Sequence, residues 1–200
     1  MIRVLFVCHG NICRSTMAQF VFQDMVNKAG LSGNFHIDSA ATSREEIGNP
    51  PHHGTVRKMK EVGIPVLPHR AVQMTKRDYE NYDHLIGMDS WNIRNMLSIV
   101  GNKDPEGKVA RLLDFTSRAG QDIADPWYTG NFDVTYRDVR EGCEGLLCQI
   151  MEKEYKKPHR KRENLVRCGT FLCLRNPFVN CILNQAVGDN AKAYNTKNQV

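Results

Sequence analysis

Residues 4–16 read Val4-Leu5-Phe6-Val7-Cys8-His9-Gly10-Asn11-Ile12-Cys13-Arg14-Ser15-Thr16, and the character of the chain changes twice along this stretch. The apolar run that ends at Val7 is rich in branched residues and predicts a strand buried on both faces. From Met17 to Ala29, apolar residues recur at helical spacing. The polar residues between them therefore form a loop that joins the carboxyl end of a strand to the start of a helix, where anions commonly bind.

Cys8 and Arg14 enclose five residues of this loop, and Ser15 follows with a hydroxyl. A short loop before a helix can turn backbone N–H groups inward, and the helix N-terminus adds partial positive charge there. Arg14 supplies a planar fork of donors that can hold two phosphate oxygens. These positive surroundings favour the nucleophilic thiolate form of Cys8, to which Ser15 can donate a hydrogen bond. The pattern predicts a phosphate-binding loop with a cysteine nucleophile.

Gly10 and Asn11 suit a tight loop. Gly10 reaches backbone conformations that other residues avoid, and Asn11 tolerates positive φ while its amide can tie the loop to its surroundings. The alternative is that Cys8 is a structural cysteine of the core and Arg14 a surface residue. We favour the phosphate loop because the spacing occurs together with a strand before it and a helix after it.

The loop resembles the active-site signature of the low-molecular-weight protein tyrosine phosphatases. Further segments fall in the order and at the spacing of that family: Asp38-Ser39-Ala40-Ala41-Thr42-Ser43, Gly48-Asn49-Pro50-Pro51, His69, Met88-Asp89 and Asp125-Pro126-Trp127-Tyr128. The resemblance covers residues 1–154 and implies catalytic roles for Cys8, Arg14 and Asp125. It also implies that phosphate is bound by the loop residues His9, Gly10, Asn11, Ile12, Cys13 and Ser15.

Such a phosphatase needs a proton donor for the departing phenolate, and Asp125 is the candidate. Pro126 rigidifies the segment after it, and Trp127 and Tyr128 could flank an aromatic leaving group. An isolated Asp-Pro pair is more often a turn, as we expect for Asp104-Pro105. The resemblance implies that Asp125 protonates the tyrosine oxygen and then takes a proton from the water that hydrolyses phosphocysteine.

Supporting roles follow from the resemblance for residues whose hydrogen bonds hold the phosphate loop in shape, namely Asn11, Ser15, Ser39 and His69. Without the resemblance, His69 would be interpreted as a histidine whose hydrogen bonds are satisfied beneath a loop. Asp89 fits a helix N-cap as well as a site residue. Cys13 fits a small buried side chain, and the resemblance implies that it can also form a reversible disulfide with Cys8.

The rest of residues 1–154 alternates between strand-like and helix-like segments. Strands are expected at 35–41, 84–88 and 109–113, and helices at 55–63, 75–82, 89–100 and from 133 to before Pro158. A capping-box pattern at Thr75 and Asp78 supports the second of these helices. The alternation predicts an α/β fold of three layers, α/β/α, with a four-stranded parallel twisted sheet and the phosphate-binding loop between its first strand and first helix.

Composition is that of an ordinary globular domain, with 41% apolar and 24% charged residues. The chain has 27 basic and 22 acidic residues, of which 9 basic and 2 acidic residues lie in residues 155–200. Residues 1–154 therefore carry 18 basic and 20 acidic residues, and this balance gives no sign of nucleic-acid binding. We expect residues 155–200 to be a disordered basic extension. No signal peptide or membrane span is apparent, which predicts a cytoplasmic protein, and we expect no cofactor or metal site. His52 and His53 have no metal-ligand partners at useful spacing and are expected at the surface.

The predicted partners are phosphotyrosine-containing proteins and small aryl phosphates. An arsenate reductase of the same fold is one alternative, but it needs further cysteines some 70 to 80 residues downstream, and this chain has none between Cys13 and Cys143. A catalytically silent phosphotyrosine binder is the other. Glu45 stands where family members usually carry an aromatic wall, so we expect a preference for substrates with nearby basic residues.

Overall fold

The structure is a computed structural model that describes residues 1–156. At its centre lies a sheet of four parallel strands, β1 (Ile2–Cys8), β2 (Phe35–Ala41), β3 (His84–Gly87) and β4 (Val109–Arg111), in the spatial order β2-β1-β3-β4. The last five residues of β1 are all buried, which explains why its sequence is a continuous apolar run. The sheet and its helices confirm the α/β fold expected from the sequence.

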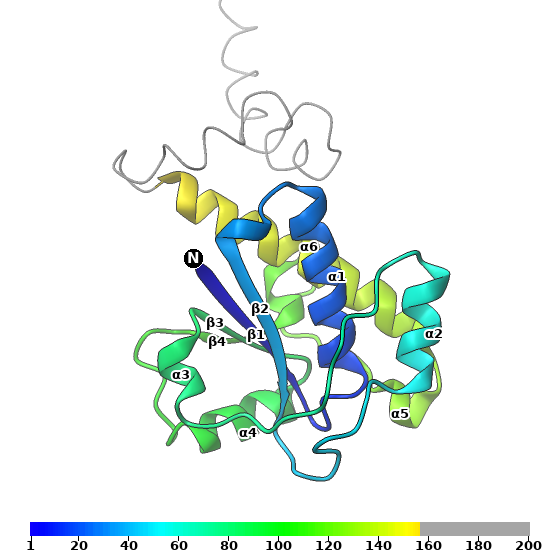
Figure 1. Ribbon diagram of the computed structural model, residues 1–200. Coiled ribbons are helices and arrows are strands. Elements are labelled where there is room, and N and C mark those ends of the chain that lie inside the picture. Colours follow the sequence, from blue (N-terminus) through cyan, green and yellow to red (C-terminus); the bar gives the residue numbers. More distant parts are fainter. Residues whose placement is uncertain (157–200) are drawn as a thin grey trace, which may run out of the picture.

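Helices cover both faces of the sheet (Figure 1). The helices α1 (Arg14–Lys28) and α6 (Phe132–Lys156) pack on one face, and α3 (Asp78–Asn81) and α4 (Ser90–Ile99) pack on the other. The helix α2 (His53–Glu61) contacts α1 and α6, and the short α5 (Pro126–Thr129) directly precedes α6. Two 3-10 turns, η1 (Ser32–Asn34) and η2 (Leu112–Phe115), complete the described elements.

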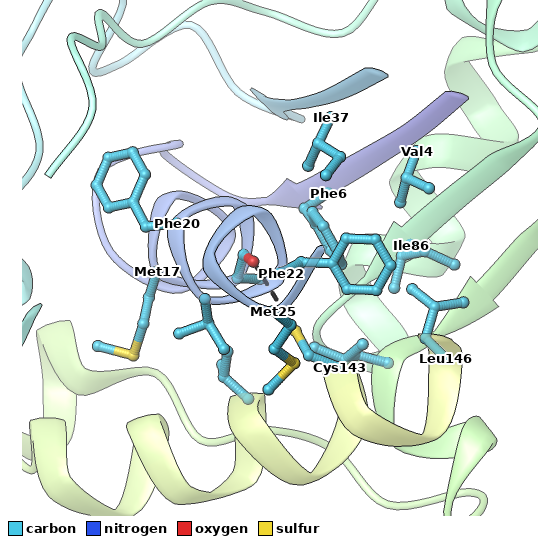
Figure 2. Packing of buried hydrophobic residues seen from close by; sticks show 14 of the residues in the cluster. Val4, Phe6, Met17, Phe20, Phe22, Met25, Ile37, Ile86, Cys143 and Leu146 are labelled. Carbon is cyan, nitrogen blue, oxygen red and sulfur yellow. Dashed lines mark hydrogen bonds between the residues drawn. The ribbon is translucent and has the colours of Figure 1, made fainter. Parts of the chain in front are cut away.

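The larger core lies between the sheet and helices α1 and α6 (Figure 2). Phe22 of α1 meets Phe6 and Phe35 edge to face, with ring centroids 5.5 Å and 5.8 Å away. Cys143 of α6 enters the same layer, where its thiol lies 3.8 Å from the carbonyl oxygen of Ala18 in α1. Because such close-packed side chains have little room to move, the loop between β1 and α1 is anchored firmly at both ends.

The carboxyl ends of the strands bring several loops together. Cys8 at the end of β1 is level with Ala41 at the end of β2, and Val7 is level with Gly87 at the end of β3. The backbone N–H of Thr42, just after β2, donates to the carbonyl oxygen of Cys8 at 2.8 Å. The loops after β1, β2 and β3 therefore meet at one edge of the sheet, where ligands of parallel α/β sheets bind.

The strand boundaries agree closely with expectation, and the largest difference is at β4. The second strand has the predicted bounds, and the third ends one residue early, at Gly87. The fourth strand ends at Arg111 instead of residue 113, because Leu112 and Leu113 turn into η2, where both are completely buried. Burial of consecutive side chains explains why this turn resembles a strand in the sequence.

The helices differ more from the prediction. The first begins at Arg14, three residues before the apolar spacing does, because its first turn is made of buried polar residues. The helix expected at residues 75–82 is limited to Asp78–Asn81, although the Asp78 carboxylate accepts from both the backbone N–H and the hydroxyl of Thr75. The four-residue helix α5 has no periodic signal in the sequence and was missed.

None of the helices within residues 1–156 combines the length and the apolar character that a membrane span requires. The predicted disordered extension, residues 155–200, lies outside the described residues from residue 157 onward.

Candidate active site

The loop from Cys8 to Arg14 surrounds the Cys8 thiol with donors. The backbone N–H of Asn11 donates to the sulfur at 3.3 Å, and the Ser15 hydroxyl oxygen lies 3.1 Å from it. Cys13 caps α1 without a side-chain hydrogen bond, and the first turn of the helix contains no acidic residue. The helix itself therefore supplies no side-chain cap and no carboxylate that would offset the partial positive charge of its N-terminus beside Cys8.

Asn11 is the point from which the loop is held. Its backbone has a φ of 58°, the left-handed conformation that Asn tolerates better than most residues. Its amide nitrogen donates to the hydroxyls of Ser15 at 2.9 Å and Ser39 at 2.8 Å, and its amide oxygen accepts from the backbone N–H of Val72 at 3.1 Å. One buried side chain thus ties the loop to α1, to β2 and to the segment beyond α2.

Gly10 serves the loop in another way than predicted. Its backbone does not adopt a positive φ, so the conformational freedom that the sequence suggested is used by Asn11 instead. A Cβ atom at Gly10 would lie 3.1 Å from Cγ of Glu46, which is tighter than usual packing allows. The glycine therefore lets the loop after β2 approach the phosphate loop closely.

Ser39 and His69 support Asn11 from outside the loop. The Ser39 hydroxyl accepts from Asn11 and donates to the side-chain oxygen of Gln19 at 2.7 Å. Nε2 of His69 lies 3.1 Å from the carbonyl oxygen of Asn11. Burial lowers the pKa of His69, with the hydrogen bond to Asn11 opposing it, so the ring is neutral near pH 7 and donates this bond from Nε2.

Arg14 joins the loop to two carboxylates. Its Nη1 donates to Asp89 at 2.5 Å and to the carbonyl oxygen of Ile123 at 3.1 Å, and its Nη2 donates to Asp125 at 2.5 Å. The buried Nε has no hydrogen-bond partner among the described residues. Burial opposes the charged form, but the nearby Cys8, Asp125 and Asp89 outweigh it and raise the pKa of Arg14. The guanidinium is thus charged and keeps one buried donor for an anion.

Asp125 reaches the site from the segment before α5. One of its oxygens caps α5 by accepting from the backbone N–H of Trp127 at 3.0 Å, while the other contacts Arg14. Trp127 and Tyr128 follow on α5 and are largely exposed. Capping fixes the carboxylate in place, and the two aromatic side chains are free to contact a ligand that enters the site.

Asp89 fits both interpretations that the sequence left open. One oxygen caps α4 by accepting from the backbone N–H of Asn92 at 2.6 Å, and the other accepts from Arg14. Gln19 was missed by the sequence analysis, although it holds Ser39 and also donates to the carbonyl oxygen of Ile37 at 3.3 Å. The feature that could have identified Gln19 is that it is a polar residue among the apolar positions of a buried helix.

The two loop cysteines differ in environment. Burial, together with the neighbouring Cys8 and Asp125, raises the pKa of Cys13 to about 12, so Cys13 remains a thiol near neutral pH. Both are free cysteines in this structure. The α6 cysteines lie in different settings, since Cys143 is completely buried and Cys148 only half-buried. Within residues 1–156, no group of His, Cys, Asp or Glu side chains could hold a metal ion.

At the rim of the site, His9 and Glu45 meet, with Nε2 of His9 3.1 Å from a carboxylate oxygen of Glu45. The prediction that His52 and His53 are both surface residues is wrong for His52. Its ring is half-buried, stacks on Phe132 with centroids 5.3 Å apart and caps α2 through the backbone N–H of Gly54. The sequence around His52 contains no signal that this N-cap histidine is partly buried.

A family profile described as low molecular weight phosphotyrosine protein phosphatase matches residues 3–157. The low molecular weight protein-tyrosine-phosphatase YfkJ of Bacillus subtilis is 41% identical over 155 residues, which cover 77% of this chain and 99% of that protein. The human low molecular weight phosphotyrosine protein phosphatase is 38% identical over 147 residues, covering 72% and 92%.

Solved structures agree with this similarity. The crystal structure of YfkJ superposes with a TM-score of 0.74 and covers 77% of this chain and 97% of that one. A low molecular weight protein tyrosine phosphatase from Streptococcus pyogenes, 39% identical, superposes with a TM-score of 0.68 and covers 78% and 97%. Both superpositions cover nearly the whole of the related chain.

Proposed function

The chain belongs to the low-molecular-weight phosphotyrosine protein phosphatase family, and from that membership we propose how it works. It hydrolyses phosphotyrosine in proteins, and small aryl phosphates, through a phosphocysteine intermediate on Cys8. Arg14 binds the phosphoryl group, and Asp125 is the general acid and base. The remaining loop residues, namely His9, Gly10, Asn11, Ile12, Cys13 and Ser15, form the cradle for the phosphate.

Cys8 is the nucleophile because hydrogen-bond donors of the loop lie around its sulfur. It accepts a backbone N–H from Asn11, lies against the Ser15 hydroxyl and sits near the uncapped N-terminus of α1. Cys13, the other cysteine of the loop, stays protonated because its pKa is raised to about 12. Only one of the two thiols is therefore suited to attack phosphorus near neutral pH.

The phosphoryl group binds between Cys8 and Arg14. The buried Nε–H of Arg14 has no partner among the described residues, and an unsatisfied buried donor is costly unless a ligand accepts from it. A phosphate oxygen would meet that need, and the helix N-terminus stabilises the remaining negative charge. This unpartnered buried donor is the main support for the proposal, because it belongs to the residue whose charge interacts with Cys8.

Two steps then follow. The Cys8 thiolate attacks phosphorus, a sulfur–phosphorus bond forms and the bond to the tyrosine oxygen breaks, while Asp125 gives its proton to that oxygen. In the second step water attacks the phosphocysteine, Asp125 takes a proton from it, and the bond between phosphorus and sulfur breaks to release phosphate and the thiolate. Ser15, which lies 3.1 Å from the Cys8 sulfur, stabilises the departing sulfur of the second step.

The proposal is tested by aryl phosphate hydrolysis in EDTA with wild type, Cys8→Ser and Asp125→Ala. We expect activity to be lost in Cys8→Ser and to fall by about 100-fold or more in Asp125→Ala. Activity that survives Cys8→Ser would refute the mechanism. An inactive, folded wild type that still binds phosphotyrosine would instead favour the silent binder.

Leaving groups of graded basicity separate acid catalysis from a loss of structure. Asp89→Asn is the matched variant, because Asp89 also pairs with Arg14 at 2.5 Å. The loss in Asp125→Ala is expected to grow with the basicity of the leaving phenolate, whereas the loss in Asp89→Asn stays the same across the series. Equal trends in both variants would contradict the role given to Asp125.

A further inference from the structure

A groove of about 650 Å³ runs along one side of α2. Its lining consists of Pro50, Pro51, His53, Val56, Arg57 and Lys60. The prolines and Val56 give it an apolar wall. The three basic side chains are spaced four and three residues apart on α2 and therefore share one face of the helix. The groove combines apolar contact with the two cations Arg57 and Lys60.

The charges of this groove are not neutralised. Within residues 1–156, no ion pair joins His53, Arg57 or Lys60 to a carboxylate. Lys58, on the buried side of α2, pairs with Glu61 at 2.7 Å and also with Asp133. Glu61 and Asp133, which line a neighbouring hollow with Arg57, are thus engaged by Lys58, and Arg57 and Lys60 form no ion pair of their own within residues 1–156.

The pKa of His52, which lies next to the groove, is affected by residues of the groove. Its pKa is lowered first by burial and then by the neighbouring His53, and Arg57 lowers it further. Glu46 acts in the opposite direction, but its carboxylate also accepts a hydrogen bond from the side chain of Asn49 at 2.7 Å. Burial is thus the main cause of the lowered pKa of His52, and Arg57 of the groove is close enough to add to it.

The groove adjoins the phosphate loop. The backbone N–H of His52 donates to the carbonyl oxygen of Ile12 at 2.8 Å, and the hydroxyl of Thr55 approaches the same oxygen at 3.4 Å. The ring of His52 also lies edge-on to that of Trp127, with centroids 5.7 Å apart. Figure 1 shows α2 beside α1, with α5 close by. The phosphate loop, Trp127 and the start of α2 are thus neighbours, so residues that flank a phosphotyrosine at Cys8 can lie near α2.

We propose that this groove binds an acidic side chain of the phosphoprotein substrate, a few residues from the phosphotyrosine, through Arg57 and Lys60. The inference rests on the proposed function, because it assigns the groove to the substrate of the same site. Charge complementarity selects the occupant: an acidic residue gains two unpaired cations, and its own methylene groups contact the apolar wall. Glu45, paired with His9 at the rim, would act on another position of the same peptide.

The effect is moderate and sensitive to salt. Exposed ion pairs are individually weak, so loss of both cations is expected to lower kcat/KM for an acidic peptide by about fivefold. The preference should also fade as the salt concentration rises from about 0.05 M to about 0.5 M, because the screening length shortens to a few ångströms. Reactions of small aryl phosphates, which cannot reach the groove, are expected to be unchanged.

The test uses phosphotyrosine peptides in which one Glu is moved stepwise away from the phosphotyrosine on either side, each with a matched Gln peptide. The enzymes are wild type, Arg57→Gln with Lys60→Gln, and a control with Lys103→Gln and Lys153→Gln. The control removes the same charge from two exposed residues at the far end of the sheet, before β4 and near the end of α6. Each is assayed for kcat/KM on the peptides and on an aryl phosphate.

We expect one Glu position to be favoured over Gln by wild type and by the control, and not by the groove variant. Equal loss in the control and the groove variant would mean that net charge alone matters, and would overturn the inference. So would a wild type that hydrolyses every Glu and Gln peptide at the same rate. A wild type that hydrolyses neither peptides nor aryl phosphate would refute the proposed function itself.

Discussion

Replacing Asn11 by alanine should damage the site more than any other single truncation outside the reacting groups. The amide makes three hydrogen bonds, to Ser15, Ser39 and the backbone of Val72, and the residue is completely buried. At about 1 kcal/mol for each bond, and about 1 kcal/mol for placing alanine at positive φ, the variant loses about 4 kcal/mol of unfolding free energy.

The chain offers a matched control for this variant. Asn102, in the turn after α4, is the other non-glycine residue with positive φ in the described part of the chain, at 56°. It is exposed, and its side chain makes no hydrogen bond within residues 1–156. Asn102→Ala therefore carries the backbone cost alone, about 1 kcal/mol. The difference between the two variants, about 3 kcal/mol, measures the three side-chain bonds.

Urea unfolding of both variants at neutral pH gives these energies, and aryl phosphate kinetics of the folded proteins give the functional effect. We expect kcat of Asn11→Ala to fall about 100-fold, because a loop displaced by about 1 Å no longer aligns the sulfur, and kcat of Asn102→Ala to be unchanged. If Asn11→Ala costs no more stability than Asn102→Ala, the reasoning that Asn11 holds the loop is wrong.

Three other predictions concern pH, packing and substrate choice. Because folding lowers the pKa of His69, its contribution to stability is present above the ordinary pKa of 6.5 and is lost as the pH falls through the lowered value. Unfolding free energies of wild type and His69→Gln between about pH 7.5 and about pH 5 should therefore converge, and a constant difference would contradict this. Gly145→Ala should lower the free energy of unfolding by about 3 kcal/mol or more, because a Cβ atom would lie 2.1 Å from the carbonyl oxygen of Phe115. Gly33→Ala, which has open space around it, should change that free energy by no more than about 0.5 kcal/mol in the same urea assay. Glu45→Gln should lower kcat/KM by about threefold for peptides with a basic residue next to phosphotyrosine and leave neutral peptides unchanged; equal rates of wild type on basic and neutral peptides would remove the idea.

Much of the fold could be predicted from the sequence because its signals are local. The buried β1 is a continuous apolar run, and β2 has the bounds that its pattern indicates. The elements that were not predicted correctly lack such signals: α5 is four residues long, and η2 buries two consecutive leucines in a turn. A pattern of apolar spacing needs several turns of helix before it can be recognised.

The sequence indicated those residues of the candidate site whose type and position fit a single chemical role. Cys8, Arg14 and Asp125 were selected from their order and spacing, and the structure brings Asp125 to Arg14 across 111 positions of sequence. Contacts that depend on tertiary packing were not visible. Gln19 holds Ser39, and His52 joins α2 to the phosphate loop, but a sequence does not show which polar side chain a distant residue will meet.

The central claim is that phosphate passes through Cys8. The most direct measurement is to quench the enzyme during turnover of an aryl phosphate, digest it and search the peptides by mass spectrometry for one added phosphoryl group. We expect this group to lie on Cys8, to appear at the rate of phenol release and to be absent from Cys8→Ser. Phosphate found on another residue, or turnover with no phosphoryl-enzyme when phosphate release is slower than phenol release, would contradict it.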